Sequence, residues 1–130
     1  MRLIRHSTTL TIVKLPSNST VPPWAQLGEF SSITRTPAEL SIVCEIRSLP
    51  PDMARPKPWV WFEVEGPLSF SLVGVLAALT VPLAEAGVSV FAIATYDTDH
   101  LLIRKREEQQ AREALTDAGH EIVTAEELRL

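Results

Sequence analysis

The sequence has little cysteine and little glycine, and both shortages exclude kinds of functional site. Cys44 is the only cysteine among 130 residues, so the chain forms no internal disulfide and no cluster of thiolate metal ligands. The five glycines include no GxGxxG motif and no Gly-Lys-Ser/Thr ending of a phosphate-binding loop. We therefore expect neither a metal centre nor a bound cofactor.

The chain also lacks a hydrophobic run long enough to cross a membrane. Its longest apolar stretch, residues 72–84, is interrupted by Thr80 and Pro82 and is shorter than the roughly 20 residues that a spanning helix needs. Arg2 and Arg5 stand where a signal peptide would have its apolar segment. The sequence thus predicts a cytoplasmic protein without a membrane partner.

An excess of basic residues, the usual mark of a nucleic-acid-binding protein, is absent as well. The formal net charge is -4. Residues 1–57 carry seven Lys/Arg and four Asp/Glu, whereas residues 58–130 carry five and twelve. This asymmetry predicts no nucleic-acid partner and indicates two units of opposite charge.

Proline is abundant instead, with ten residues that gather mainly in 16–23 and 50–58. Each proline lacks the donor that a sheet ladder needs, so residues 49–58 are interpreted as a linker between a half at 1–57 and a half at 58–130. In the first half, β-branched and alternating patterns predict strands at 8–15, 30–36 and 39–46, with a hairpin at Thr36-Pro37-Ala38 and a helical turn at 24–27.

The second half alternates strands and helices. The patterns predict strands at 59–65, 88–94, 100–104 and 120–123, and helices at 72–86 and 106–118. Ser69 or Ser71 is the expected cap of the first helix, and Gly87 its stop. The resulting order, β-α-β-β-α-β, is the split βαβ arrangement of ferredoxin-like domains, so the fold class is α+β.

The helix predicted at 72–86 is apolar on nearly all sides. One small sheet cannot cover all of that surface, so both faces of the helix must contact protein. Pro82 should kink this helix without ending it. We therefore expect a homo-oligomer, at least a dimer, in which the halves pack side by side.

Two segments of the second half carry candidate binding residues. The backbone N–H groups at the start of the 72–86 helix suit a carboxylate or phosphate, and Gly74 in its first turn indicates either close approach of a ligand or tight helix–sheet packing. The second segment, Thr95 to His100, contains Asp97 and Asp99, which are typical turn formers. A metal site would need more ligands than these aspartates and His100 supply.

Two stretches of the second half, EGPLSFSLVGVL at 65–76 and PLAEAGVSVFAIATYDTD at 82–99, resemble an ACT domain. They are similar to the small stand-alone bacterial ACT proteins related to aspartokinase regulatory domains and to the CASTOR arginine sensors. The resemblance implies a ferredoxin-like ACT domain at 58–130 and a degenerate ACT-like, β-rich half at 1–57. It also implies that an amino acid binds at an interface between ACT units, against Leu72, Val73, Gly74, Thr95, Tyr96 and Asp97.

These observations predict a non-catalytic regulatory protein that senses a free amino acid. An enzyme that this protein regulates is expected as a further partner. The α-carboxylate suits the N–H groups near Gly74, and the α-ammonium suits the carboxylate of Asp97. One alternative is a ligand-free module that regulates an enzyme by docking. Another is a small enzyme that uses Asp97, Asp99 and His100.

Overall fold

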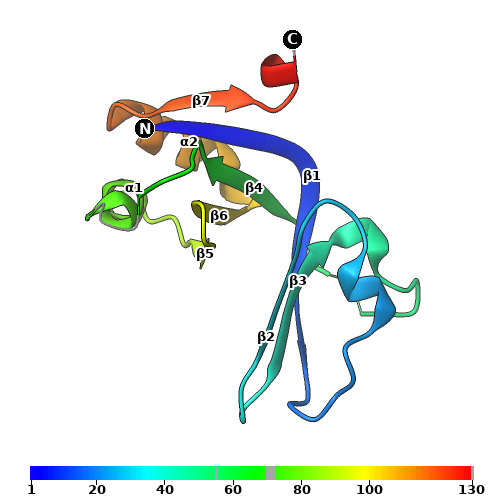
Figure 1. Cartoon of the computed structure of the whole chain (residues 1–130). Coiled ribbons are helices and arrows are strands. Elements are labelled where there is room, and N and C mark those ends of the chain that lie inside the picture. The colour runs from blue at the N-terminus through cyan, green and yellow to red at the C-terminus, as the bar shows by residue number, and fades with distance from the viewer. Residues whose placement is uncertain (55, 70–72, 130) are drawn as a thin grey trace. The chain divides into compact units, whose positions relative to one another are not determined.

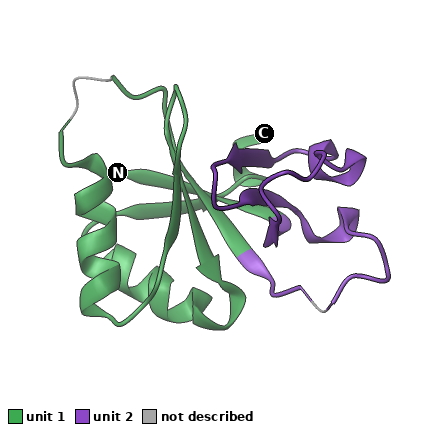
Figure 2. Ribbon diagram, turned by 90° about the horizontal axis from the view of Figure 1, so that it is seen from below, with its two compact units in different colours: residues 1–7, 60–130 green, residues 8–59 purple. Residues whose placement is uncertain are grey.

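A computed structural model describes residues 1–54, 56–69 and 73–129, and it is an α+β structure (Figure 1). The expected fold class is therefore confirmed. The chain forms two compact units, coloured separately in Figure 2. Unit 1 comprises Met1–Ser7 and Val60–Leu130, and unit 2 comprises Thr8–Trp59. The boundary near residue 59 lies close to the expected linker, but the first seven residues belong with the C-terminal part of the chain.

Strand β1, Arg2–Leu15, supplies residues to both units and is longer than the strand expected at 8–15. Its first residues pair in parallel with β7, Glu121–Thr124, in the register Leu3↔Ile122. Within unit 1 the strand order is β7-β1-β4-β6-β5. The strand β1 thus lies between β7 and β4, where a four-stranded ferredoxin-like sheet would pair those two strands directly.

The other elements of unit 1 follow in the order β-α-β-β-α-β along the chain. They are β4 (Trp59–Val64), α1 (Val75–Glu85), β5 (Phe91–Ala94), β6 (Asp99–Arg104), α2 (Glu108–Asp117) and β7. A short 3-10 turn, Lys105–Glu107, leads into α2, and another, Glu127–Arg129, follows β7. Strand β5 begins three residues later than expected, because the Val88 N–H donates to the Leu83 carbonyl and so caps α1.

The core of unit 1 lies between the sheet and the two helices. Alternate strand residues such as Phe62 and Leu101 are fully buried there against Leu79 and Leu83 of α1 and Leu115 of α2. Trp61 and His100 alternate with these core residues along β4 and β6, so their side chains lie on the opposite face of the sheet. None of the helices in the part of the chain that the structure describes is long and apolar enough to span a membrane.

Helix α1 differs from the expected helix at its start. It begins at Val75, three residues later than predicted, and its N-cap is Gly74 in the left-handed conformation. Ser69 is therefore not its cap, and Ser71 lies outside the described residues. The helix continues through Pro82, as expected, and ends before Gly87. Leu79 and Leu83 are its only buried described residues, whereas the apolar side chains of Leu76 and Val81, on different sides of the helix, are exposed within this chain.

Unit 2 is a small antiparallel β structure. Strands β2 (Ser31–Arg35) and β3 (Leu40–Glu45) form the expected hairpin, and β3 also pairs with the second part of β1 in the register Ile12↔Val43. The 3-10 turn Pro23–Gln26 matches the helical turn that the sequence predicts, and a further 3-10 turn, Ile46–Ser48, follows β3. Its core contains Ala25, Leu40, Ile42 and Cys44. Residues 50–54 and 56–58 form neither helix nor strand, in agreement with the linker interpretation.

Candidate functional site

A cavity of about 150 Å³ opens in unit 1 where the segment before α1 meets the turn after β5. It is lined by Leu68, Ser69, Val75, Tyr96, Asp97, Thr98 and Asp99. These residues come from the two segments that the sequence analysis selected independently of each other. The fold therefore brings both candidate segments to one place.

The turn after β5 is held by its threonines and by its main chain. Thr95 donates from both its backbone N–H and its hydroxyl to the Thr98 carbonyl, each at 2.9 Å. The Thr98 hydroxyl donates to the carbonyl of Val64 at 2.5 Å, which attaches the turn to the end of β4. The Leu68 N–H donates to the Asp97 carbonyl at 2.6 Å. One wall of the cavity is thus fixed to the other by main-chain hydrogen bonds.

Gly66 allows this close approach of the two segments. A Cβ atom at residue 66 would lie 3.1 Å from the Asp97 carbonyl oxygen and 3.1 Å from the Thr98 Cβ. Both distances are shorter than an ordinary van der Waals contact, and one of the neighbouring atoms is backbone. The role of close approach that the sequence analysis considered for Gly74 therefore belongs to Gly66.

The start of α1 leaves backbone donors without acceptors inside the helix, and its first residue, Val75, lines the cavity. The Ala78 N–H donates to the Gly74 carbonyl at 2.9 Å, which closes the first helical turn. The N–H groups of Val75, Leu76 and Ala77 precede that bond and have no acceptor within the helix. Among the residues that the structure describes, no side chain caps this helix end. The expected donor group at Leu72 to Gly74 is therefore shifted by three residues, because the helix itself starts later.

The predicted site residues occupy different positions around the cavity. Tyr96 and Asp97 line it, and Thr95 stabilises the turn beneath them. Val73 is 94% exposed, Gly74 is the helix cap, and Leu72 lies outside the described residues. Sequence reasoning missed five lining residues, because their roles depend on where the helix begins and on how the turn folds back: Leu68, Ser69, Val75, Thr98 and Asp99.

The charge of the lining is acidic. Asp97 and Asp99 contribute two carboxylates, and none of the lining residues is basic. Tyr96 is 80% exposed and stands at the rim. A ligand in this cavity thus meets carboxylate acceptors from the turn and the positive end of a helix dipole from α1.

Comparison with known proteins assigns the family. The sequence model of the ACT domain matches residues 54–117, and the model of a family described as an N-terminal domain matches residues 9–52. The crystal structure of protein Atu0741 from Agobacterium tumefaciens is 36% identical, with a TM-score of 0.86, over 95% of this chain and 92% of that one. The chain belongs to the ACT-domain family. The resemblance stated from the sequence is thereby confirmed.

A second solved structure shares the fold of this ACT-domain protein. It is that of VC0802 from Vibrio cholerae, a protein of unknown function described as a possible transport protein. It is 24% identical, with a TM-score of 0.72, over 87% of this chain and 85% of that one. A comparison with curated proteins found no match.

The ACT domain separates His100 from the two aspartates of the turn. Asp99 and His100 are consecutive in β6, so their side chains lie on opposite faces of the strand. Asp99 lines the cavity, whereas the His100 ring is buried and accepts a hydrogen bond from Trp61. The cluster of Asp97, Asp99 and His100 that an enzyme would use is not assembled in one place. Among the residues that the structure describes, no three His, Cys, Asp or Glu side chains are grouped to hold a metal ion.

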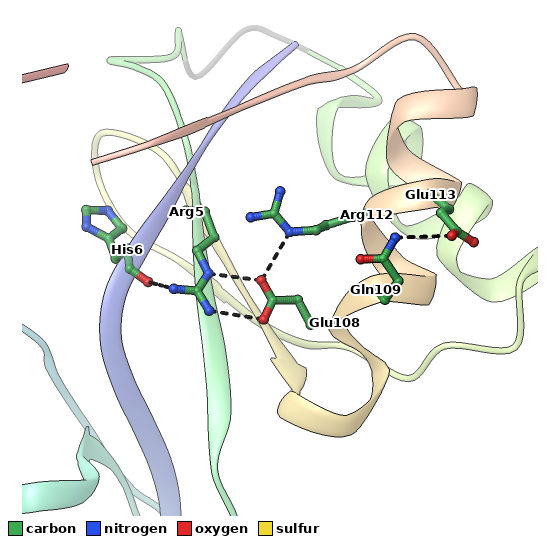
Figure 3. Close-up of polar contacts among 6 residues, drawn as sticks. All are labelled: Arg5, His6, Glu108, Gln109, Arg112 and Glu113. Carbon is green, nitrogen blue, oxygen red and sulfur yellow. Dashed lines mark hydrogen bonds and ion pairs between the residues drawn. The ribbon is translucent and has the colours of Figure 1, made fainter. Parts of the chain in front are cut away.

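A second polar cluster of the ACT domain joins β1 to α2 (Figure 3). The Arg5 guanidinium donates to both carboxylate oxygens of Glu108 at 3.0 Å, and Arg112 donates to the same carboxylate at 3.1 Å. Partial burial raises the pKa of Glu108, but the hydrogen bonds and charges of Arg5 and Arg112 outweigh burial and hold it below its usual value of 4.5. The cluster therefore connects the strand β1 to the helix α2.

Proposed function

We propose that this ACT-domain protein binds a free amino acid in the cavity between α1 and the 95–99 turn and acts as a non-catalytic regulatory sensor. The observation that carries the proposal is the composition of that cavity. It brings Val75, the first residue of α1, together with the carboxylates of Asp97 and Asp99, and we propose that the N–H groups of the first helical turn meet the ligand there. An amino acid presents a carboxylate and an ammonium group a few ångströms apart, and these two sets of groups complement both charges.

The exposure of the cavity supports a position for the ligand at an interface between two chains. The cavity is open to solvent, and the exposed Val73 and Tyr96 stand beside it. In our proposal a second ACT unit covers this side and completes the pocket, so the ligand lies at an interface within a homo-oligomer. The output is then a change in the activity of a partner enzyme in the cytoplasm.

We propose further that the two units have a common origin. Residues 59–124 have the β-α-β-β-α-β order of a ferredoxin-like domain, to which β1 adds one strand. Residues 8–59 have strands and 3-10 turns but no α-helix in their described part. We interpret them as a degenerate ACT-like half that has lost its helices.

A melting-temperature screen against the twenty amino acids tests whether a ligand exists. A ligand that binds only the folded state raises the free energy of unfolding by about 2.7 kcal/mol at a hundredfold excess over its dissociation constant. Asp97→Asn should abolish that stabilisation, because it removes the acceptor charge and keeps the size of the side chain. The variant should stay folded without ligand, since the turn is held by the Asp97 main-chain carbonyl and not by its carboxylate.

Val75→Trp provides a second, independent test of the position of the pocket. Val75 lines the cavity in the first turn of α1, so an indole there fills the space that the ligand needs. Thr116→Trp is the matched control, because Thr116 is an exposed β-branched residue of α2 that does not line the cavity. Ligand stabilisation that survives both Asp97→Asn and Val75→Trp would show that the site lies elsewhere.

An alternative function is a docking module that has lost its ligand. The exposed apolar side chains of Val73, Leu76 and Val81 favour this alternative, because they offer a surface for another protein. If no amino acid at millimolar concentration shifts the melting temperature of the parent protein, the docking module becomes the better interpretation.

A further inference from the structure

Three rings lie next to one another on the adjacent strands β1, β4 and β6 of unit 1. The His6 imidazole stacks on the Trp61 indole, with ring centroids 3.6 Å apart and planes inclined by 16°. On β6, the His100 Nδ1 accepts a hydrogen bond from the Trp61 Nε1–H at 3.0 Å. Trp61 and His100 are 5% and 8% exposed, so this hydrogen bond is shielded from water.

The direction of the hydrogen bond determines the protonation state of His100. An indole nitrogen is a donor and cannot accept, so the His100 Nδ1 must carry a lone pair. His100 is therefore neutral, with its proton on Nε2. If Nδ1 took up a proton, two N–H groups would point at each other in a buried place, and the Trp61 contact would be lost.

The hydrogen bond of His6 needs a proton on its ring nitrogen, where that of His100 needs a lone pair. The His6 Nε2 lies 2.9 Å from a carboxylate oxygen of Glu63, which requires a proton on that nitrogen. That proton is present in the imidazolium and in one neutral tautomer alike, so protonation of His6 preserves its contact with Glu63. Only one of the two histidines that flank Trp61 has a contact that protonation breaks.

The charges around His100 come from three strands. Glu63 on β4 and Asp99 on β6 favour its protonation, His6 on β1 opposes it, and its partner across β5 is the apolar Ile93. Burial is the largest influence and disfavours the charged ring, so the pKa of His100 lies below its ordinary value of 6.5.

We propose that His100 is an acid-sensitive positioning residue of the ACT domain, whose protonation breaks the Trp61–His100 hydrogen bond and releases the start of β6. The residues immediately before it, Thr98 and Asp99, line the cavity, so the released segment is one wall of the candidate site. The hydrogen bond exists without a ligand. A failure of this inference therefore leaves the proposed amino-acid binding untouched, and the reverse also holds.

Protonation of His100 lowers the free energy of unfolding. The folded-state pKa is below that of the unfolded chain, so the unfolded state binds more protons between the two values. The stabilising contribution of neutral His100 is complete above about pH 6.5, the unperturbed imidazole value. It is lost as the pH falls through the folded pKa.

The experiment is a pH titration by nuclear magnetic resonance on the full chain without ligand. The signals to follow are the His100 ring proton and the Trp61 indole N–H, the latter assigned from spectra of Trp24→Phe and Trp59→Phe variants. We expect both signals to change with one common midpoint below pH 6.5. A His100 midpoint at or above 6.5, or a Trp61 signal that stays constant while His100 titrates, would overturn the inference.

A pair of variants separates the histidines. His100→Asn places an amide oxygen near the position of Nδ1, so it keeps an acceptor for Trp61 but does not titrate. We expect it to remove the acid transition of the Trp61 signal, whereas His6→Gln should retain that transition. A transition that persists unchanged in His100→Asn would contradict the proposal. If His100→Asn does not fold, the titration of the parent protein alone decides the question.

Discussion

At the scale of single residues, two glycines with similar backbone conformations serve different purposes. Gly74 and Gly28 have φ angles of +79° and +87°, a region that is unfavourable for residues with a Cβ atom. A Cβ at Gly74 would have no heavy atom within 4 Å. A Cβ at Gly28 would lie 1.6 Å from a carboxylate oxygen of Glu45. Only Gly28 therefore combines backbone conformation with a steric requirement.

The carboxylate that excludes a side chain at Gly28 is fully buried. It accepts a hydrogen bond from the Glu29 N–H at 2.5 Å and another from the Arg47 guanidinium at 2.7 Å. A side chain at residue 28 must displace this carboxylate and break the contact with Glu29. The loss of hydrogen bonds to a buried charged group then adds to the conformational cost.

We predict that Gly74→Ala lowers the free energy of unfolding by about 1 to 2 kcal/mol, the conformational cost alone. Gly28→Ala should lower it by clearly more, because the Glu45 carboxylate must also move. Urea unfolding of the two variants side by side measures the difference. Equal losses for Gly28→Ala and Gly74→Ala would mean that the Glu45 contact contributes nothing.

The sequence singled out Gly74 for close approach of a ligand or for tight helix–sheet packing. The structure uses this glycine as a left-handed cap with open space around it, so tight packing is not its role, and the close approach of two backbone segments occurs at Gly66. The role of Gly28 was not predictable from local pattern. Its partner Glu45 is a distant residue of the chain, on another element of unit 2.

At the scale of elements, α1 contains a proline whose missing donor is replaced from outside the helix. Pro82 has no N–H for the Ala78 carbonyl. The His120 Nε2 lies 3.0 Å from that carbonyl oxygen and donates to it, from the residue just before β7. The Thr80 hydroxyl donates to the carbonyl of Leu76, two residues before Ala78, at 3.0 Å. The helix therefore tolerates Pro82 because a side chain supplies the absent donor.

We predict that His120 and Pro82 are energetically coupled. His120→Ala should cost about 0.5 to 1.5 kcal/mol, the usual net contribution of a hydrogen bond. In a Pro82→Ala background the helix regains its own donor to Ala78, so the same substitution should cost less. A double-mutant cycle by urea unfolding measures this coupling. A His120→Ala cost that is the same in both backgrounds would contradict the role assigned to His120.

Elements with a local signal were predictable, and those that depend on distant partners were not. The β2–β3 hairpin and α2 follow from alternation and helical periodicity in their own residues. The first part of β1 was missed because Arg2 and Arg5 do not resemble a strand. Their charges are met by Glu65 and Glu108, which lie far away in the sequence.

At the scale of the whole molecule, the family and the two candidate segments could be predicted, but the shape of the site could not. The residues just after β4 and the turn before β6 meet around one cavity because β4 and β6 are neighbours in one sheet. That neighbourhood depends on the long-range pairing of these two strands. The late start of α1 then decides which N–H groups face the cavity, and no motif in the sequence indicates that start.

The exposed apolar side chains of α1 favour association of this chain with a second copy. The sequence predicted that both faces of this helix contact protein, and within a single chain Val73, Leu76 and Val81 remain 94%, 37% and 51% exposed. Burying a valine or leucine side chain contributes about 1.5 to 3 kcal/mol. Val81 lies on the side of α1 opposite the buried Leu79 and Leu83, and a second copy of the chain packed on that side would recover this energy.

We therefore predict at least a dimer at micromolar concentration, and Val81→Glu should weaken it by more than about tenfold, because 1.4 kcal/mol corresponds to a factor of ten. Sedimentation equilibrium measures the dissociation constant. Thr116→Glu is the matched control, because it adds the same charge at an exposed β-branched residue of α2. It should leave association unchanged. If the parent protein sediments as a monomer, the predicted dimer is wrong. The cavity would then have to bind its ligand within one chain.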